Sequence, residues 1–276
     1  MYNAICKSLA MAAVVLFAAA CGDSRSDAAR ELCRQSESEI AAGRHYAAIG
    51  LLDTLDSRYR DLTEVRRSGM AIRARAMEGI ALDSIPLYDA RLAAATLAVD
   101  SMRPLFEHVD GAPGIDGYYL PKGTDRRAFA TTGIQGRVSD DGLFYIAASV
   151  AGRSIGLRAL ELRSGAETCT SADISPARVV TVRGSEAASF SPEEVDVLGR
   201  WLTAHRGQVK LVLRGRRSDI SQALSARQQK EIVDCYAYAK ALQEQRTASI
   251  RREKYERMLA TARDQIANLT PAPDND

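Results

Sequence analysis

The chain has 276 residues, a length that suits one large domain or two smaller ones. It carries 37 basic and 35 acidic residues, so the formal net charge at pH 7 is only +2. A balance this even gives no reason to expect a nucleic-acid partner, because binding to phosphate backbones depends on clustered positive charge.

Residues 1–20 have the features of a secretory signal peptide. Lys7 supplies a basic start, and the uncharged run that follows ends in small residues before Cys21. This run is too short to span a bilayer, which needs about 20 apolar residues. A cysteine directly after small residues resembles the lipobox of bacterial lipoproteins, although Ala18 stands where leucine is commoner. We expect a signal at 1–20, a lipid on Cys21 and a polar tether over 21–27; the alternative is an ordinary signal followed by an incidental cysteine.

The lipid would set the location of the chain. Each buried methylene of an acyl chain contributes about 0.8 kcal/mol, so a lipid-modified Cys21 would hold the chain on a membrane. The tether contains Asp23 and Asp27 but also Arg25, so it lacks the continuous acidic run of surface-exported lipoproteins in some anaerobes. We therefore expect the periplasmic face of the outer membrane.

Residues 28–110 are rich in Ala, Leu, Arg and Glu and predict a helical region. A first helix should end at Gly43, because glycine accepts the positive φ of a helix stop. A second helix should run from His45 to Tyr59. The stretch 43–48 resembles the turn of a tetratricopeptide-type hairpin, with His45 in the aromatic position. Only one such unit is evident, and solenoids need at least about three, so we interpret it as a local packing device; a peptide-binding groove is the alternative.

Two more helices are predicted, over 62–81 and 83–109, with Pro86 in the first turn of the second, where proline is tolerated. Three Asp-Ser/Thr-apolar triplets in the helical region resemble an O-glycosylation sequon of some anaerobic bacteria. The candidate acceptors are Thr54, Ser84 and Ser101.

Residues 111–224 predict a β-rich head with one helix. Strand-like runs occupy 129–138, 143–150, 155–162, 178–183 and 208–213. Gly142, after two aspartates, predicts a hairpin turn between the first two runs. Ser191 and Glu194 form a capping box at the start of a helix, and Trp201 on that helix faces the core. We expect a mostly antiparallel sheet with this helix against one face.

Residues 225–270 predict one long C-terminal helix, because no glycine or proline interrupts 226–269 and Ser225 with Gln228 forms a capping box. A helix this long suggests a coiled-coil partner, either the earlier helices of the same chain or another copy. The predicted architecture is therefore α+β: a helical hairpin, a stalk of long helices paired with the C-terminal helix, and an antiparallel head between them. We expect residues 271–276 to form a disordered tail.

This arrangement resembles a group of uncharacterised envelope lipoproteins from anaerobic gut-type bacteria. The segments that carry the resemblance are 83–87, 117–119, 141–145 and 232–236. The group has no established activity, so the resemblance implies an architecture and a location only.

The sequence contains no recognisable catalytic or metal-binding motif. The histidines are scattered, at positions 45, 108 and 205. We therefore expect no catalytic residue, no metal and no cofactor. Cys169 and Cys235 could form one disulfide in an oxidising compartment, but buried free thiols, as for Cys33, are the favoured interpretation.

The best ligand-site candidate is the patch Tyr118, Tyr119, Lys122, Arg126 and Arg127. Tyrosines can stack on sugars or peptides, and the cations can pair with carboxylate or phosphate. The favoured alternative is a loop pinned to the head by its tyrosines. A second basic cluster, at residues 214, 216 and 217, could meet anionic lipid, although a solvated turn is the simpler interpretation.

These features lead to ranked hypotheses for the function. The first is a non-enzymatic, lipid-anchored envelope protein that contacts another envelope protein or itself. The second is a peptide- or glycan-binding lipoprotein that uses the head through Tyr118 and Tyr119. An enzyme is the third.

Overall fold

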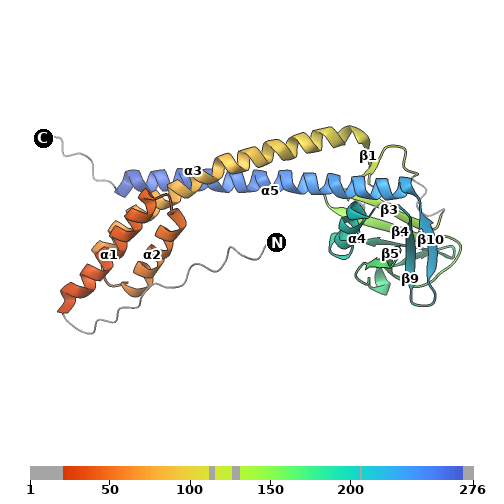
Figure 1. Cartoon of the computed structure of the whole chain (residues 1–276), viewed down its shortest axis with the longest axis horizontal. Helices are drawn as coiled ribbons and strands as arrows, with labels where there is room; N and C mark the ends of the chain where they lie inside the picture. The colour runs from red at the N-terminus through yellow and green to blue at the C-terminus, as the bar shows by residue number, and fades with distance from the viewer. Residues whose placement is uncertain (1–20, 112–115, 126–130, 206, 270–276) are drawn as a thin grey trace. The chain divides into compact units, whose positions relative to one another are not determined.

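A computed structural model of the chain shows an α+β protein, as the sequence predicts (Figure 1). It describes residues 21–111, 116–125, 131–205 and 207–269. The chain divides into two compact units. We call them the helical unit, residues 1–85 and 254–276, and the head unit, residues 86–253. The predicted signal, the predicted tail, Arg126 and Arg127 lie outside the described residues.

The helical unit contains a hairpin of two helices, α1 (Cys21–Ala41) and α2 (His45–Arg58). Gly43 between them has φ +72°, which confirms the predicted helix stop. The polar stretch after Cys21, expected as a tether, is the first part of α1 instead. One reason is that Arg25 is held by Asp61, with 2.8 Å between the guanidinium and the carboxylate. The hairpin core is formed by Ala29, Cys33, Leu52, Leu55 and Ile72.

One continuous helix, α3 (Thr63–Met102), replaces the two helices predicted over 62–81 and 83–109. Pro86 lies inside it and removes one backbone donor, which leaves the carbonyl of Leu82 without its usual partner. Both residues are exposed, so water can take that place, and the helix continues. The predicted helical end was also wrong: the chain turns at η1 (Arg103–Leu105) and becomes a strand.

The head unit holds two antiparallel sheets. One has the order β1-β2-β3-β4-β8-β7, and the other β10-β9-β5-β6. The strands are β1 (Phe106–Val109), β2 (Tyr118–Pro121), β3 (Gly133–Ser139), β4 (Phe144–Val150), β5 (Leu157–Ser164), β6 (Glu167–Thr170), β7 (Val180–Val182), β8 (Ser185–Phe190), β9 (Val209–Gly215) and β10 (Ile220–Leu224). The five predicted runs fall on β3, β4, β5, β7 and β9, while the other five strands were not predicted.

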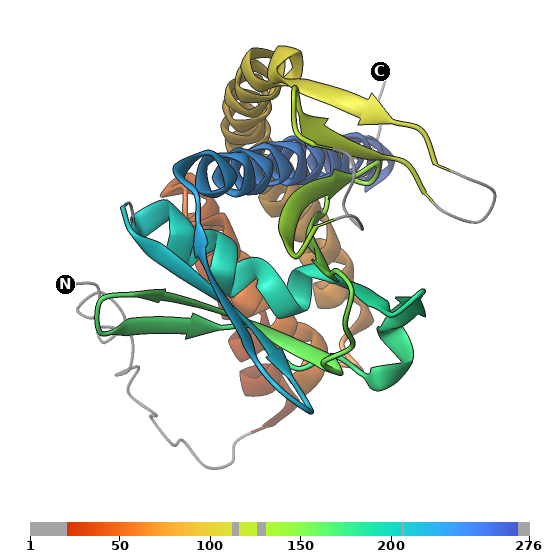
Figure 2. The same cartoon turned by 90° about the vertical axis from the view of Figure 1, so that its right-hand side faces the viewer.

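Helix α4 (Pro192–Ala204) and parts of α3 and α5 (Ala226–Leu269) complete the head core. Helix α4 follows η2 (Pro176–Arg178) and β8, and the capping box predicted at Ser191 is present. Helix α5 packs its first turns against β3, where Gly136 lies so close that an added Cβ would be 3.0 Å from the Cα of Ile232. Figure 2 looks onto this unit and shows α4 beside the strands. The core joins both sheets to α4 and α5.

Helices α3 and α5 are linked by side chains in each unit. In the head unit, the amide nitrogen of Gln245 donates to the hydroxyl of Thr96 over 3.0 Å. In the helical unit, the guanidinium of Arg263 donates to the carboxylate of Glu78, also over 3.0 Å. The long C-terminal helix is therefore paired with the preceding long helix, as predicted, while a coiled-coil geometry for this pair stays a prediction.

Three cysteines are free thiols in the core of the described residues. Cys33, Cys169 and Cys235 are all buried and unbridged. The thiol of Cys169 is 3.6 Å from the carbonyl of Val197, and that of Cys235 is 3.3 Å from the carbonyl of Gly136. The alternative of a Cys169–Cys235 disulfide was therefore wrong, because the two side chains are held in different places in the core.

Candidate functional site

The two tyrosines of the predicted ligand patch lie on β2 and, being adjacent, point to opposite faces of the sheet. Tyr119 faces the core, where its ring lies edge-on to Tyr238 with 6.0 Å between centroids. Tyr118 faces outward, and the guanidinium of Arg137 covers one face of its ring at 4.2 Å from the centroid. The structure therefore does not bring the two rings into one stacking platform. Lys122 is exposed in the turn that follows β2.

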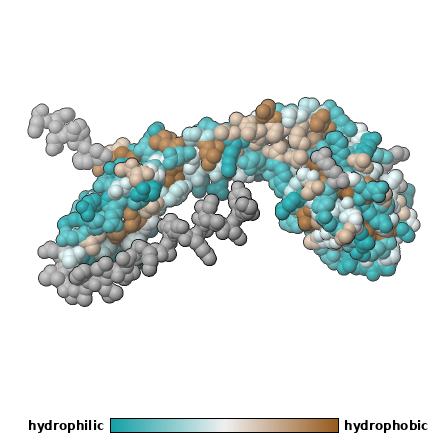
Figure 3. Space-filling view, in the orientation of Figure 1, coloured by the Kyte–Doolittle hydropathy of each residue, from teal (hydrophilic) through white to brown (hydrophobic). Residues whose placement is uncertain are grey.

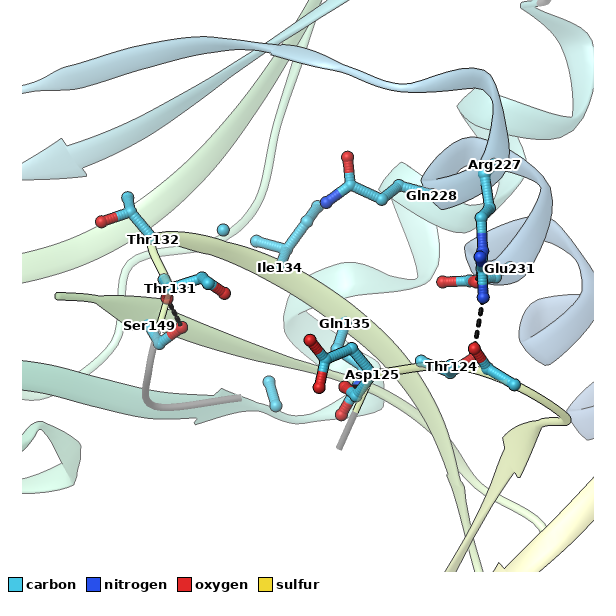
Figure 4. Close-up of a pocket in the computed structure, with 13 residues that line it drawn as sticks. Thr124, Asp125, Thr131, Thr132, Ile134, Gln135, Ser149, Arg227, Gln228 and Glu231 are labelled. Carbon is cyan, nitrogen blue, oxygen red and sulfur yellow. Dashed lines mark hydrogen bonds and ion pairs between the residues drawn. The ribbon is translucent and has the colours of Figure 1, made fainter. Parts of the chain in front are cut away.

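A hollow of about 260 Å³ lies next to this turn. It opens because β2 pairs with β3 only through Tyr118 and Tyr119, after which the two strands separate. The walls are the segment 123–125, the beginning of β3 and the first turns of α5 (Figure 4). The polar side chains used below are Thr124, Asp125, Gln135, Arg227, Gln228 and Glu231.

The turn at the hollow is fixed by a glycine and by α5. Gly123 has φ +77°, a conformation that favours glycine, and the amide of Thr124 donates to the carbonyl of Pro121 over 3.1 Å. The guanidinium of Arg227 donates to the carbonyl of Gly123 and, over 2.8 Å, to the carboxylate of Glu231. These bonds place the turn against α5 without using the hydroxyl of Thr124.

That hydroxyl is the least satisfied polar group of the hollow. Thr124 is 8% exposed, and its Oγ1 has no hydrogen-bond partner. A buried hydroxyl left without a partner costs about 1–3 kcal/mol. Among the described residues, the only other buried side-chain atom in this state is Nδ1 of His45, in the helical unit. An unpartnered group that lines a hollow can be satisfied by a ligand.

The opposite wall is held by a series of bonds along β3. The amide of Gln135 donates to the carbonyl of Asp125 over 2.9 Å and accepts from Arg137 over 2.8 Å. The hydroxyl of Ser149, on β4, donates to the carbonyl of Thr131 over 2.7 Å. Gln135 thus joins the hollow to the outward face that carries Tyr118 and Arg137.

Three ionisable groups line the hollow among the described residues. They are the carboxylates of Asp125 and Glu231 and the guanidinium of Arg227. Because Arg227 already binds Glu231 and a carbonyl, it is poorly placed to clamp an anion.

Sequence reasoning missed these residues, apart from Gln228, which it assigned to a helix cap. Gln228 does form that cap, since its side-chain oxygen accepts from the amide of Ser225 over 3.1 Å. Thr124 follows Gly123 in a turn. That glycine was the one feature of the sequence that could have indicated the turn. Nothing in the sequence indicates that Arg227, more than a hundred residues later, meets the same turn.

The second basic cluster is bound within the head. Arg214 pairs with the buried Glu161 over 2.6 Å. Arg216 donates to the carbonyls of Leu157 and Ile174 over 3.0 and 2.8 Å. These arginines hold loops and strands together, which neither the lipid-binding interpretation nor the solvated turn anticipated.

The three candidate glycosylation sites lie within helices. Thr54 is in α2, and Ser84 and Ser101 are in α3. The hydroxyl of Thr54 donates to the carbonyl of Gly50 over 3.1 Å, and that of Ser101 to Ala98 over 2.8 Å. A glycan at either position would replace a local helix bond.

The part of α3 in the head unit has an exposed apolar face. Leu87 is 52% exposed and Leu97 72% exposed, and Ala90 and Ala94 between them are also exposed. At about 100° per residue these four positions share one side of the helix, and none carries a charge. Figure 3 shows apolar surface along this helix. Exposed helix faces are normally polar, so the apolar character of this face is unusual.

The described part of the chain offers neither a group of three or more acidic, histidine or cysteine side chains that could hold a metal nor a helix able to cross a membrane. No known protein family, curated protein or solved structure matches the chain.

Proposed function

We propose that the chain is a non-enzymatic, lipid-anchored protein of the bacterial cell envelope that acts through protein–protein contact. The anchor is the lipid on Cys21, and the location is the periplasmic face of the outer membrane. The signal-like residues 1–20 and the small residues before Cys21 support this part of the proposal. The exposed apolar face of α3 carries the proposed mode of action.

The partner that packs against that face is a second copy of this chain. Leu87, Ala90, Ala94 and Leu97 follow the 3-4-3 spacing of a two-helix seam. Read in either direction the order is Leu, Ala, Ala, Leu. Two antiparallel copies therefore place Leu87 against the second copy's Leu97, and Ala90 against its Ala94, twice by symmetry. Such a self-complementary order is what a two-fold interface requires.

The seam covers only residues 87–97, about one and a half heptads, so the contact is weak. Its central layers are alanine, so the two helices approach closely. Anchoring would compensate for this weakness, because copies held on one membrane meet at a raised effective concentration. The proposed role is therefore to join anchored copies side by side.

In-cell crosslinking of the tagged full chain tests the proposal. The native chain should give a crosslinked dimer in the membrane fraction, and Leu97→Glu should reduce that dimer at least tenfold, because it buries a charge in the seam. Val197→Glu, an exposed aliphatic residue of α4, is the matched control and should retain the dimer. Recovery of a different envelope protein in place of the dimer, or a dimer unaffected by Leu97→Glu, would contradict self-association.

A second candidate function is binding of a peptide or glycan by the head. Tyr118 and Arg137 on the outward face, next to the hollow, support it. Tyr118→Ala should then weaken retention on the ligand with little change in melting temperature. Tyr119→Ala is unsuitable for this test, because that ring packs on Tyr238 in the core and its loss would destabilise the head.

A further inference from the structure

We infer that His108 acts as a pH-dependent clasp that ties the β1–β2 hairpin to the turn between β3 and β4. We call His108 together with Asp110 and Asp140 the histidine clasp. The clasp is closed while the imidazole ring carries a proton on both nitrogens, and it weakens when the ring becomes neutral. This conformational switch goes beyond both proposed functions and depends on neither of them.

Both ring nitrogens of His108 lie within hydrogen-bond distance of a carboxylate. Nε2 is 2.8 Å from Asp140 in the β3–β4 turn, and Nδ1 is 3.1 Å from Asp110, directly after β1. An ionised carboxylate can only accept a hydrogen bond, and a neutral imidazole has only one N–H to donate. Because aspartates are ionised above about pH 4, both bonds exist together at neutral pH only when the ring is an imidazolium.

The pair of His108 and Asp140 occupies a space that depends on a glycine. A Cβ on Gly117 would lie 2.8 Å from Nε2 of His108 and 2.8 Å from a carboxylate oxygen of Asp140. The ring of His108 also meets that of Tyr119 on β2, with 4.9 Å between centroids. The imidazole therefore contacts both strands of the hairpin and the β3–β4 turn.

Few titratable groups surround the ring. Among the described residues, those that face it are Asp110, Asp140 and the phenol of Tyr119, which is neutral at physiological pH. Glu107, the preceding residue on β1, points to the opposite face of the strand. The two aspartates thus determine the charge that the imidazole meets.

The clasp spans a weakly paired part of the six-stranded sheet. Among the described residues, β2 pairs with β3 through Tyr118 and Tyr119, and β1 lies at the end of the strand order. The bond from His108 to Asp140 gives the hairpin a further attachment to the β3–β4 turn. Because the charges are partly exposed, losing this attachment should open the hairpin locally rather than unfold the head.

The electrostatics act in the direction that the clasp requires. The hydrogen bond to Asp140 raises the pKa of His108 above its ordinary value of 6.5, and Asp110 raises it further, while partial desolvation lowers it less. Because the folded pKa is raised, the contribution of the clasp is complete below about pH 6.5 and is lost as the pH rises through the folded value. The clasp is therefore closed on the acidic side and weakened on the alkaline side.

A pH titration of the histidine Cε1–H signals by NMR tests the charge of the ring. The full chain is used in detergent, and its three histidines are assigned with single substitutions. His108 should titrate above pH 6.5, and Asp140→Asn should lower its pKa by about half a unit or more, because the variant loses the charged acceptor. Asp141→Asn removes the same charge from the same turn without removing a bond to the ring, and it should change the pKa clearly less.

Amide hydrogen exchange tests whether the ring controls the hairpin. After correction for the intrinsic pH dependence of exchange, amides of β1 and β2 should exchange about threefold faster above the folded pKa of His108 than below it. In His108→Gln this difference should disappear, because glutamine has no charge to lose, whereas Asp141→Asn should retain it.

Three results would overturn the inference. They are a His108 pKa at or below 6.5, a pKa that Asp140→Asn leaves unchanged, and a hairpin exchange rate that keeps its pH dependence in His108→Gln. Neither measurement involves a ligand or a dimer, so the outcome is independent of both proposed functions.

Discussion

Glu186 is a buried carboxylate that connects the six-stranded sheet to the beginning of β5. It is 2% exposed, and its oxygens accept the backbone N–H groups of Ile155, Gly156 and Leu157 at 3.0–3.1 Å, together with the hydroxyl of Ser154. Burial alone would raise the pKa of Glu186, but these hydrogen bonds outweigh it and lower the pKa below its ordinary value of 4.5. The carboxylate is therefore held in its charged form.

Replacing Glu186 with Gln should lower the free energy of unfolding of the head by about 2 kcal/mol at pH 7, since a hydrogen bond to a charged group contributes about 1.5–3 kcal/mol. Trp201, the single tryptophan, lies in the head and reports its unfolding by fluorescence in urea. Glu244→Gln, an exposed position on α5, is the control and should change little.

The same residue gives the head an acid sensitivity. Because the folded pKa of Glu186 is lowered, its contribution is complete above the pH at which the unfolded carboxylate ionises, and it is lost as the pH falls through the folded pKa. The stability difference between the native chain and Glu186→Gln should therefore shrink below about pH 4. A difference that stays constant from pH 7 to pH 3 would contradict this account.

The buried thiols lead to a prediction about reactivity. Burial raises the pKa of the Cys235 thiol well above its usual range, and it also raises those of Cys33 and Cys169. Thiolate is the reactive form, so maleimide should label none of the three in the folded protein and all three in denaturant. Peptide mass mapping without reduction should show no bridge between Cys169 and Cys235. Rapid labelling of Cys235 in the folded state would contradict its place in the core.

Packing between β3 and α5 depends on a missing side chain. A Cβ on Gly136 would lie 3.0 Å from the Cα of Ile232 and 3.3 Å from the Cβ of Cys235, and the first of these is backbone that cannot rotate away. Gly136→Ala should therefore separate the strand from the helix and lower the free energy of unfolding by about 1–3 kcal/mol, as overpacking does.

Gly50→Ala is the opposite case, because nothing lies within 4 Å of its added Cβ inside α2. It should stabilise by about 0.5–1 kcal/mol, and thermal unfolding by far-UV circular dichroism compares the two.

Elements with a local signal were predictable from the sequence. The α4 helix was marked by its capping box at Ser191, the β3–β4 hairpin by Gly142, which has φ +76°, and the α1–α2 turn by Gly43. In each case the residues that determine the structure are neighbours in the chain. The length of α5 followed in the same way, from the absence of any glycine or proline in it.

Elements that depend on distant partners were not predictable. Strands β1, β2, β6, β8 and β10 are short, and each is stabilised by pairing with a neighbour rather than by its own pattern. Pro86 was expected near a helix start, but the exposed position of its turn allows α3 to pass through it. The hollow shows the same limit, since Thr124 and Arg227 meet only after β2, β3 and α5 are assembled.

At the scale of the whole molecule, the proposal combines a predicted anchor with a weak contact of the α3 face. If the face of α3 joins copies only when the lipid confines them, then the two features must act together. A soluble chain would meet its copies at the bulk concentration, whereas anchored chains share one surface and behave as if they were far more concentrated. A contact of about one and a half heptads would then be mostly dissociated in solution and mostly formed on the membrane.

Cys21→Ser tests this coupling. The substitution should remove the lipid, move the chain from the membrane fraction to the soluble fraction and abolish the crosslinked dimer, although α3 is unchanged. Leu97→Glu should abolish the dimer and leave the chain in the membrane fraction. Fusing the Cys21→Ser chain to an unrelated membrane anchor should restore the dimer, because confinement rather than the lipid itself is what the contact requires. A dimer that persists in the soluble Cys21→Ser chain would mean that the α3 contact is strong enough to form without an anchor.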